Sequence, residues 1–316
     1  MTLAGKRIQP NWPVRRATPL LTALQVAVSL AAILNISMAP PKAAADDISH
    51  EMGKIKAKSL LEISGIAASR KNPNVLWVHN DGDTKYLYAV TTTGSVVCQL
   101  ATEVLVDDLE DMAIGPGLEK GVDYIYLGDI GDNDSKRPDV RVIRFAEPSL
   151  EAAQGQPTAA LGQVFRFAYP DGPHDAEALM VDPITGDVLI ATKSKKESRV
   201  YRAAALKNDF AKLELVAMLD VDNVSAGDIS RDGSLIALRK EETGWLWERR
   251  SGESLQTALA RKPRKIPVLG KNQGNNGESI AFAPDGRGYF TISEGRQGKI
   301  YLFDLPAEKA DKRATK

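Results

Sequence analysis

Apolar residues recur along the chain in short runs, separated by turns rich in glycine, proline and aspartate. One phrase occurs five times: small or acidic residues, then an aliphatic residue, then a turn. The aliphatic residues, at intervals of 46, 67, 50 and 51 residues, are Ile66, Met112, Leu179, Ile229 and Ile280. A period of about fifty residues filled with strand-like runs is typical of a β-propeller, in which each repeat forms one four-stranded blade.

Each copy of the phrase is followed by further β-rich runs, with turn residues at every junction. The expected second strands are 75–79, 124–128, 188–192, 235–238 and 288–292. The expected third strands are 86–91, 140–145, 199–202, 244–248 and 299–303. The expected fourth strands are 95–100, 163–168, 213–219 and 265–269, so the fifth repeat lacks one.

The missing strand can come from the other end of the repeat region. We predict that residues 54–59 close the last blade, because this leaves no blade edge unpaired. The longest interval is explained by a loop at 148–162 rather than by a hidden blade. The sequence therefore predicts an all-β propeller of five blades, with six as the alternative if one degenerate repeat is present.

The amino-terminal segment has the pattern of an export signal: bases, then an apolar run from Leu20 to Met38, then small residues ending at Ala45. We expect cleavage there and a periplasmic or secreted protein, with an uncleaved membrane anchor as the alternative. The expected domains are a signal peptide at 1–45, a propeller at 46–305 and a charged tail at 306–316.

Composition narrows the class of protein. The whole chain is formally neutral, but residues 1–45 hold five bases and no acid, so the remainder carries a net charge of −5. A mildly acidic body without a Lys/Arg-rich stripe argues against a nucleic-acid partner. A single cysteine, Cys98, excludes an internal disulfide. We expect a monomer with no membrane contact after cleavage.

Polar residues recur where the first strands begin and where the second strands end. Antiparallel pairing brings these positions to one mouth of the central channel. The second strands of blades five, one and two end in acids and those of blades three and four end in bases, so an acidic arc is expected to face a basic arc. The acids with expected metal-binding roles are Glu62, Asp81, Asp111, Asp129, Asp228, Glu278 and Glu294.

Converging carboxylates repel one another by about 3 kcal/mol per pair at 6 Å, so they need a cation, a base or raised pKa values. Irregular rings of oxygen ligands suit Ca²⁺ better than Mg²⁺. We expect Glu110, Glu177 and His174 to act as catalytic groups, and Lys193 and Arg239 to hold an anionic substrate group.

Two other interpretations remain open. Acids at strand starts can simply accept backbone hydrogen bonds from a neighbouring blade, and calcium, if bound, can be purely structural. The hypotheses for function are a calcium-dependent hydrolase of a small anionic substrate, and a non-catalytic propeller that binds a ligand or a protein partner.

Several phrases resemble an exported bacterial β-propeller family of phytase-like or six-bladed-like proteins. They are the segments 61–69, 76–81, 128–133, 175–179 and 277–281. The resemblance implies calcium-assisted phosphoester hydrolysis at the channel mouth, although no complete set of catalytic residues from a characterised enzyme can be matched. It supports the fold more than any one reaction.

Overall fold

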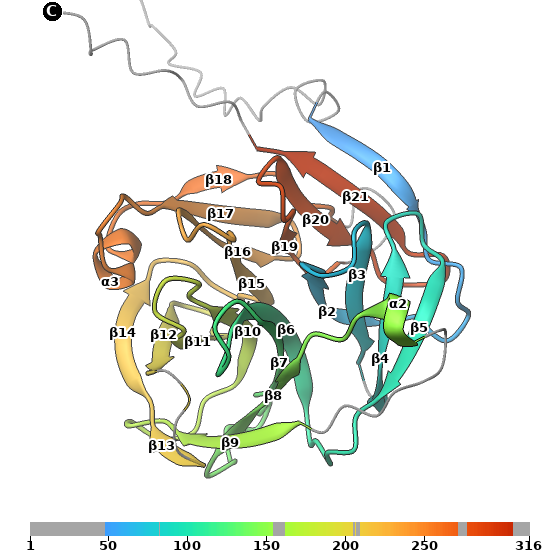
Figure 1. Cartoon of the computed structure of the whole chain (residues 1–316). Coiled ribbons are helices and arrows are strands. Elements are labelled where there is room, and N and C mark those ends of the chain that lie inside the picture. Colours follow the sequence, from blue (N-terminus) through green and yellow to red (C-terminus); the bar gives the residue numbers. More distant parts are fainter. Residues whose placement is uncertain are drawn as a thin grey trace, which may run out of the picture. The chain divides into compact units, whose positions relative to one another are not determined.

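Five antiparallel sheets, each built mostly from consecutive strands, make up the fold of this computed structural model (Figure 1). The structure describes residues 48–305, except for 82, 154–161, 205, 207–208 and 271–276. All of these residues belong to one compact unit. Among them the sheets number five, in agreement with the five blades predicted from the repeats, and six blades are excluded.

The strands of each blade follow one another from the channel outward. Blade 1 contains β2 (Ile63–Ala68), β3 (Val75–Asn80), β4 (Asp83–Thr91) and β5 (Val96–Ala101). Blade 2 contains β6 (Leu109–Pro116), β7 (Asp123–Asp129), β8 (Val140–Ala146) and β9 (Gln163–Ala168). Blade 3 contains β10 (Ala176–Val181), β11 (Val188–Thr192), β12 (Ser198–Ala203) and β14 (Glu214–Leu219).

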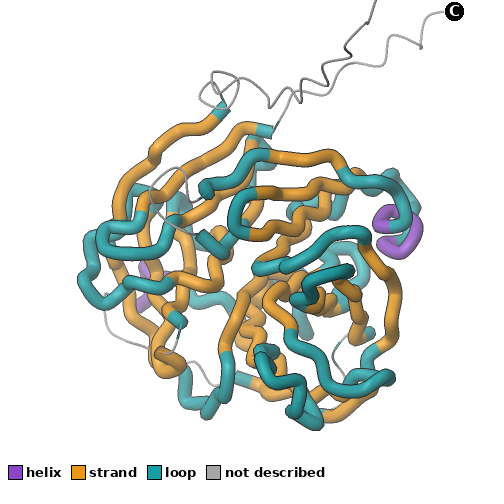
Figure 2. Tube along the Cα trace, turned by 180° about the vertical axis from the view of Figure 1, so that it is seen from behind, coloured by secondary structure: helices purple, strands orange, loops and turns teal. Residues whose placement is uncertain are grey.

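The remaining two blades complete the ring. Blade 4 contains β15 (Ala226–Ile229), β16 (Leu235–Lys240), β17 (Thr243–Glu248) and β18 (Arg264–Ile266). Blade 5 contains β19 (Ala281–Phe282), β20 (Gly288–Ile292), β21 (Lys299–Asp304) and β1 (Ser49–Lys54). The first strands contact one another in ring order, β2 with β6, β6 with β10, β10 with β15, β15 with β19 and β19 with β2. Figure 2 shows the same ring from behind.

The hydrophobic core is divided among the five junctions between blades. Each junction holds one apolar cluster drawn from two neighbouring sheets. Both faces of an inner strand are therefore covered, and every residue of β2, β10, β11 and β20 is buried. This explains why these segments are mostly apolar or small rather than alternating, as a strand buried on both faces requires; the exception is Glu177 in β10.

The strand that closes the ring is β1, which pairs with β21 in an antiparallel register from Ser49↔Phe303 to Lys54↔Lys299. The predicted topology is confirmed, but the predicted residues, 54–59, were wrong. Ile55 is buried and donates its N–H to the Gly298 carbonyl at 2.8 Å, so this segment is the connection into blade 1. The strand itself is polar, because its outer edge faces solvent.

Three small elements lie outside the repeat. Strand β13 (Phe210–Lys212) adds to blade 2 in parallel with β9, although it belongs to the connection between β12 and β14 of blade 3. Short helices occupy Leu150–Ala153 (α2) and Leu255–Leu259 (α3). No helix in the part of the chain described is long and apolar enough to cross a membrane. The expected export signal and the charged tail lie outside the described residues.

Candidate binding site at the acidic mouth of the channel

The start of each first strand lies beside the end of its second strand, as the sequence predicts. The register pairs Ile63 with Asn80 in blade 1, and Leu109 with Asp129 in blade 2. A backbone hydrogen bond of 2.6 Å from Asp81 to the Glu62 carbonyl continues this pairing beyond the strands. The residues around these ends form one mouth of the channel, the acidic mouth.

Carboxylates of four blades gather at the acidic mouth and influence one another electrostatically. They are Glu62, Asp81, Asp108, Glu110, Asp175, Glu177, Glu278 and Glu294. Among the predicted metal-binding and catalytic acids, the structure therefore brings together Glu62, Asp81, Glu110, Glu177, Glu278 and Glu294. Asp108 was missed, although its position directly before β6 is the signal that identified the others.

Glu110 has the most perturbed carboxyl group of the mouth. Partial burial, together with the charges of Glu177, Asp108 and Asp81, raises its pKa to about 9. A side chain at Gly131 would collide with Glu110 Oε1 and Asp108 Oδ2, so these two oxygens converge on the same small space. Burial and neighbouring acids raise the pKa of Asp108 as well. Glu110 is therefore protonated at neutral pH while the mouth holds no cation.

Glu177 forms an ion pair with Lys193. One of its oxygens accepts a hydrogen bond from Lys193 Nζ, whereas the other, Oε2, is buried and has no partner. Burial raises the pKa of Glu177 to about 7 even though Lys193 opposes the shift. The pKa of Lys193 is raised, because burial lowers it but the hydrogen bond to Glu177 raises it by more.

The opposite side of the mouth is built from blade 5. Burial, Glu278 and Glu62 raise the pKa of Glu294 to about 7. Glu278 also lines a hollow of about 350 Å³ that reaches across to Lys193 on blade 3. The hollow has room for a small ligand, since ligand pockets begin at about 300 Å³. Its other lining residues are Asn223, Ser225, Lys240, Glu241 and Glu242.

Two of the predicted metal-binding acids connect blades instead of facing the mouth. Asp111 is fully buried and accepts backbone hydrogen bonds from Met112 (2.8 Å), Leu179 (2.9 Å) and Gly227 (3.2 Å). Its pKa is raised well above the usual range by burial, which these bonds only partly offset. Asp228 occupies the equivalent position in blade 4 and accepts from Ile229 (2.8 Å) and Phe282 (2.7 Å). Both carboxylates thus join first strands across the channel.

The third acid outside the group at the mouth is Asp129, which is fully buried. It forms ion pairs with Arg137 at 3.0 Å and Arg141 at 2.6 Å. Its oxygen Oδ1 also accepts backbone hydrogen bonds from Asp107 and Asp108. These contacts neutralise the carboxylate inside blade 2, so it is not presented to the mouth with Glu110.

The two bases expected to hold an anion, Lys193 and Arg239, both have partners in the structure. Arg239 is fully buried, and its guanidinium donates to the carbonyls of Ser279 (3.0 Å), Glu241 (3.1 Å) and Leu269 (3.1 Å). Burial lowers its pKa to about 10 despite the nearby Glu278 and Glu294. Arg239 is therefore bonded to backbone, whereas Lys193 is bonded to Glu177 and also lines the hollow, so its expected role in holding an anion stays a prediction.

His174 lies in a separate aromatic cluster of blade 3. Its Nε2 is 3.1 Å from Asp171 Oδ1 and 3.0 Å from the Tyr201 hydroxyl. The ring stacks on Tyr201 and meets Tyr169 edge-on. The described partners of His174 are therefore Asp171, Tyr201 and Tyr169, and its expected catalytic role stays a prediction.

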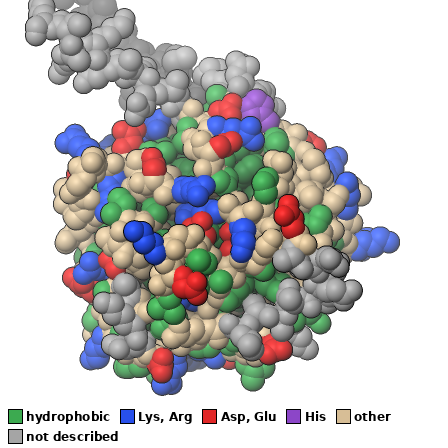
Figure 3. All heavy atoms as spheres, viewed as in Figure 1, with side chains coloured by type: hydrophobic (Ala, Val, Ile, Leu, Met, Phe, Trp, Pro, Cys, Tyr) green, Lys and Arg blue, Asp and Glu red, His purple; other side chains and the backbone are tan. Residues whose placement is uncertain are grey.

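The acidic mouth carries hard oxygen donors but no preformed metal cage. Among the described residues, no three carboxylate, imidazole or thiolate groups surround a common point. The converging Asp108 and Glu110 oxygens and the unpartnered Glu177 Oε2 are nevertheless the donor type that Ca²⁺ prefers. On the face shown in Figure 3, acidic and basic side chains are interspersed, and neither sign forms a large patch.

Comparison with known proteins adds little beyond the fold. No family model matches the chain, and no curated protein matches it. Similar solved structures include a PQQ-bound aldose sugar dehydrogenase from Streptomyces coelicolor, at 12% identity and a TM-score of 0.47, covering 81% of this chain and 97% of that one. Another is the Dos1 propeller, at 12% identity and a TM-score of 0.37, covering 77% of this chain and 68% of that one.

Proposed function

We propose that the protein binds a positively charged ligand at the acidic mouth, with Ca²⁺ as the inorganic candidate. The observation that carries this proposal is the gathering of eight carboxylates whose nearby bases are few and already engaged: Lys193 with Glu177, Arg137 with Asp129, and Arg239 with backbone carbonyls. The mouth accommodates this excess by protonation, since the pKa values of Glu110, Glu177 and Glu294 are raised to about 9, 7 and 7. A bound cation would replace those protons.

Asp108, Glu110 and Glu177 are the residues that would hold the ion. Two of their oxygens converge beside Gly131, and the buried Glu177 Oε2 lacks a partner. With few carboxylates around any one point, such an ion would keep part of its water shell, which Ca²⁺ tolerates through its flexible coordination. Because protons and cation compete, binding should strengthen as pH rises toward 9.

Isothermal titration calorimetry with CaCl₂ and MgCl₂ tests this directly. We expect saturable Ca²⁺ binding that Glu110→Gln weakens by about ten-fold or more, the usual cost of losing one charge-assisted contact. A matched control is Glu248→Gln, which removes an exposed carboxylate from the outer part of blade 4. Equal losses in both variants, or no heat in the unmodified protein, would contradict a site at the mouth.

A second candidate function is acid–base hydrolysis at the same mouth. It is favoured by the pKa values of neighbouring Glu110 and Glu177, about 9 and 7, because carboxyl groups held at different values suit the acid and base roles. Glu110 would donate a proton to the leaving group, and Glu177 would accept one from water. A phosphoester substrate is less favoured than a neutral one, because the acids repel its charge, Lys193 is bonded to Glu177 and Arg239 is bonded to backbone carbonyls.

Hydrolysis is tested separately from binding. Lactone and phosphoester substrates would be screened from pH 5 to 10 without added calcium, because a cation held by Glu110 would displace the proton that this residue must donate. If Glu110 is the acid, turnover should fall on the alkaline side near pH 9, and Glu110→Gln should lose at least about 10²-fold in rate. Turnover that is equal in the Glu110→Gln variant would rule out this role.

A further inference from the structure

The opposite end of the channel, where the first strands finish, carries arginines. Arg70 is the second residue after β2, and Arg231 is the second residue after β15. Both line a narrow slot of about 10 Å³ together with Ile114, Asp228 and Phe282. They also line an adjoining hollow of about 380 Å³, which is bounded by segments of blades 1 and 5.

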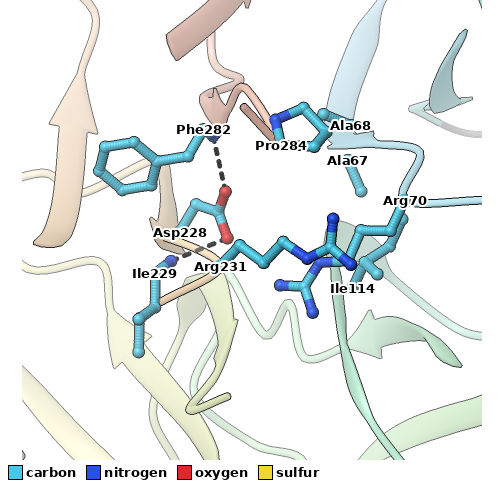
Figure 4. A pocket seen from close by; sticks show the side chains of 9 residues that line it. All are labelled: Ala67, Ala68, Arg70, Ile114, Asp228, Ile229, Arg231, Phe282 and Pro284. Atoms are coloured by element: carbon cyan, nitrogen blue, oxygen red, sulfur yellow. Dashed lines mark hydrogen bonds between the residues drawn. The ribbon is translucent and has the colours of Figure 1, made fainter. Parts of the chain in front are cut away.

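The two guanidinium groups lie side by side and reach into the slot from opposite directions (Figure 4). Side-by-side guanidinium groups repel each other unless an anion lies between or beside them. Arg70 is ordered by an ion pair of 2.9 Å from Nη1 to Asp123, and its side chain is only 8% exposed. Its position is therefore set by packing, independently of any ligand.

The counter-charges nearby do not satisfy Arg231. Among the described residues it makes no ion pair or hydrogen bond, and it is exposed to solvent. Asp228 directs its oxygens to the backbone N–H groups of Ile229 and Phe282, as the dashed lines in Figure 4 show. Asp285 is paired with Arg287 at 3.2 Å. Among the described residues, the guanidinium of Arg231 is thus left without an ion pair, although Asp228 lines the same slot.

We propose that this end of the channel binds an oxyanion, specifically the phosphate group of a small molecule, in the adjoining hollow beside Arg70 and Arg231. The planar fork of a guanidinium matches phosphate oxygens with two parallel hydrogen bonds. The adjoining hollow is large enough for the rest of a small ligand. Its walls include Pro73, Pro284 and Phe290, which suit an apolar or aromatic body.

Titration with inorganic phosphate at constant ionic strength tests the anion site. We expect saturable binding to the unmodified protein and about ten-fold weaker binding to Arg231→Ala, from the loss of charge-assisted hydrogen bonds. Arg250→Ala, an exposed arginine that lines neither hollow, should bind phosphate normally. Absence of saturable binding, or equal weakening in both variants, would overturn the proposal.

Two further measurements place the ligand. Phenyl phosphate should bind more tightly than inorganic phosphate, since its ring can enter the hollow; equal or weaker binding would overturn that part. If Lys193→Ala abolishes phosphate binding while Arg231→Ala leaves it unchanged, the anion lies at the acidic mouth and the assignment to Arg70 and Arg231 is wrong. Because Arg231 is exposed, circular dichroism should show an unchanged fold in its variant.

Discussion

The two ends of the channel differ in charge, although the same repeated strand builds both. Where the first strands begin, carboxylates such as Glu110 and Glu177 outnumber the basic side chains around them. Where they finish, Arg70 and Arg231 face a shared slot. The repeated strand therefore serves as a common scaffold, and the residues at or just beyond its two ends determine the chemistry of each mouth.

A packed layer separates the two ends. Asp111 lies fully buried between them and joins β6 to the first strands of blades 3 and 4. In blade 1 the equivalent position is Gly65, where any side chain would collide with the buried ring of His79. Burial lowers the pKa of His79 to about 4, so this ring is neutral. Each mouth can consequently bind its own ligand without direct competition.

The largest expected effect comes from opening the ring on which both mouths depend. Deleting residues 49–54 removes β1 and exposes the edge of β21, which should cost about 5 kcal/mol or abolish cooperative unfolding. Deleting the tail at 306–316 should change the free energy of unfolding by less than about 0.5 kcal/mol. Urea denaturation of both deletions provides the measurement, and equal tolerance would contradict closure by β1.

The next effect concerns the layer between the mouths. Asp111→Ala leaves the buried N–H groups of Leu179 and Gly227 without an acceptor, which should cost about 3 kcal/mol. The exposed Asp134→Ala is the control and should cost less than about 0.5 kcal/mol. Chemical denaturation compares the two. A loss in Asp111→Ala no larger than in the control would show that this layer does not hold the blades together.

Adjacent acids in β6 show what a sequence can and cannot reveal. The repeat predicted the blades closely, and strands β11 and β20 have the predicted bounds. It also predicted that acids gather at strand starts. It did not separate Glu110, which faces the mouth, from Asp111, which binds backbone, because that depends on which neighbouring N–H groups lack partners. Period-two alternation contained the signal, since successive side chains point in opposite directions.

The errors on basic residues have a related cause. Arg239 was expected at the mouth because it lies at the end of a second strand. Its guanidinium is instead buried and donates to the carbonyls of Leu269 and Ser279. Such long-range backbone contacts are not encoded in the local pattern. Arg70 and Arg231 could have been identified from the same topology, because residues that follow first strands must meet at the other end of the channel.

A smaller effect is expected from the acid with the highest pKa in the mouth. The pKa of Glu110 is about 9 in the folded protein and near 4.5 when unfolded. The folded state therefore binds more protons across this window, so stability falls as pH rises from about 4.5 to 9. Glu110→Gln should flatten that fall and, without cation, raise stability at pH 8 by about 2 kcal/mol. Thermal melts across pH check it, and a steeper fall in the variant would contradict the sign.

The smallest effect is expected at Lys193. Replacing it with methionine removes a positive charge that opposes a cation, so the Ca²⁺ dissociation constant should decrease by about two-fold. Calorimetric titration of Lys193→Met measures this, with Lys58→Met, an exposed lysine ahead of blade 1, as the control. Weaker Ca²⁺ binding in Lys193→Met would mean that the lysine supports the cation site rather than opposing it.

Melting the unmodified protein with and without calcium at pH 6 and pH 8 shows whether the acidic mouth exchanges protons for a cation. Ligand at about 100 times its dissociation constant should raise the melting temperature by about 5 °C. We expect a larger rise at pH 8 than at pH 6, because fewer protons then occupy Glu110 and Glu177. A melting temperature that does not respond to calcium at either pH would contradict this exchange.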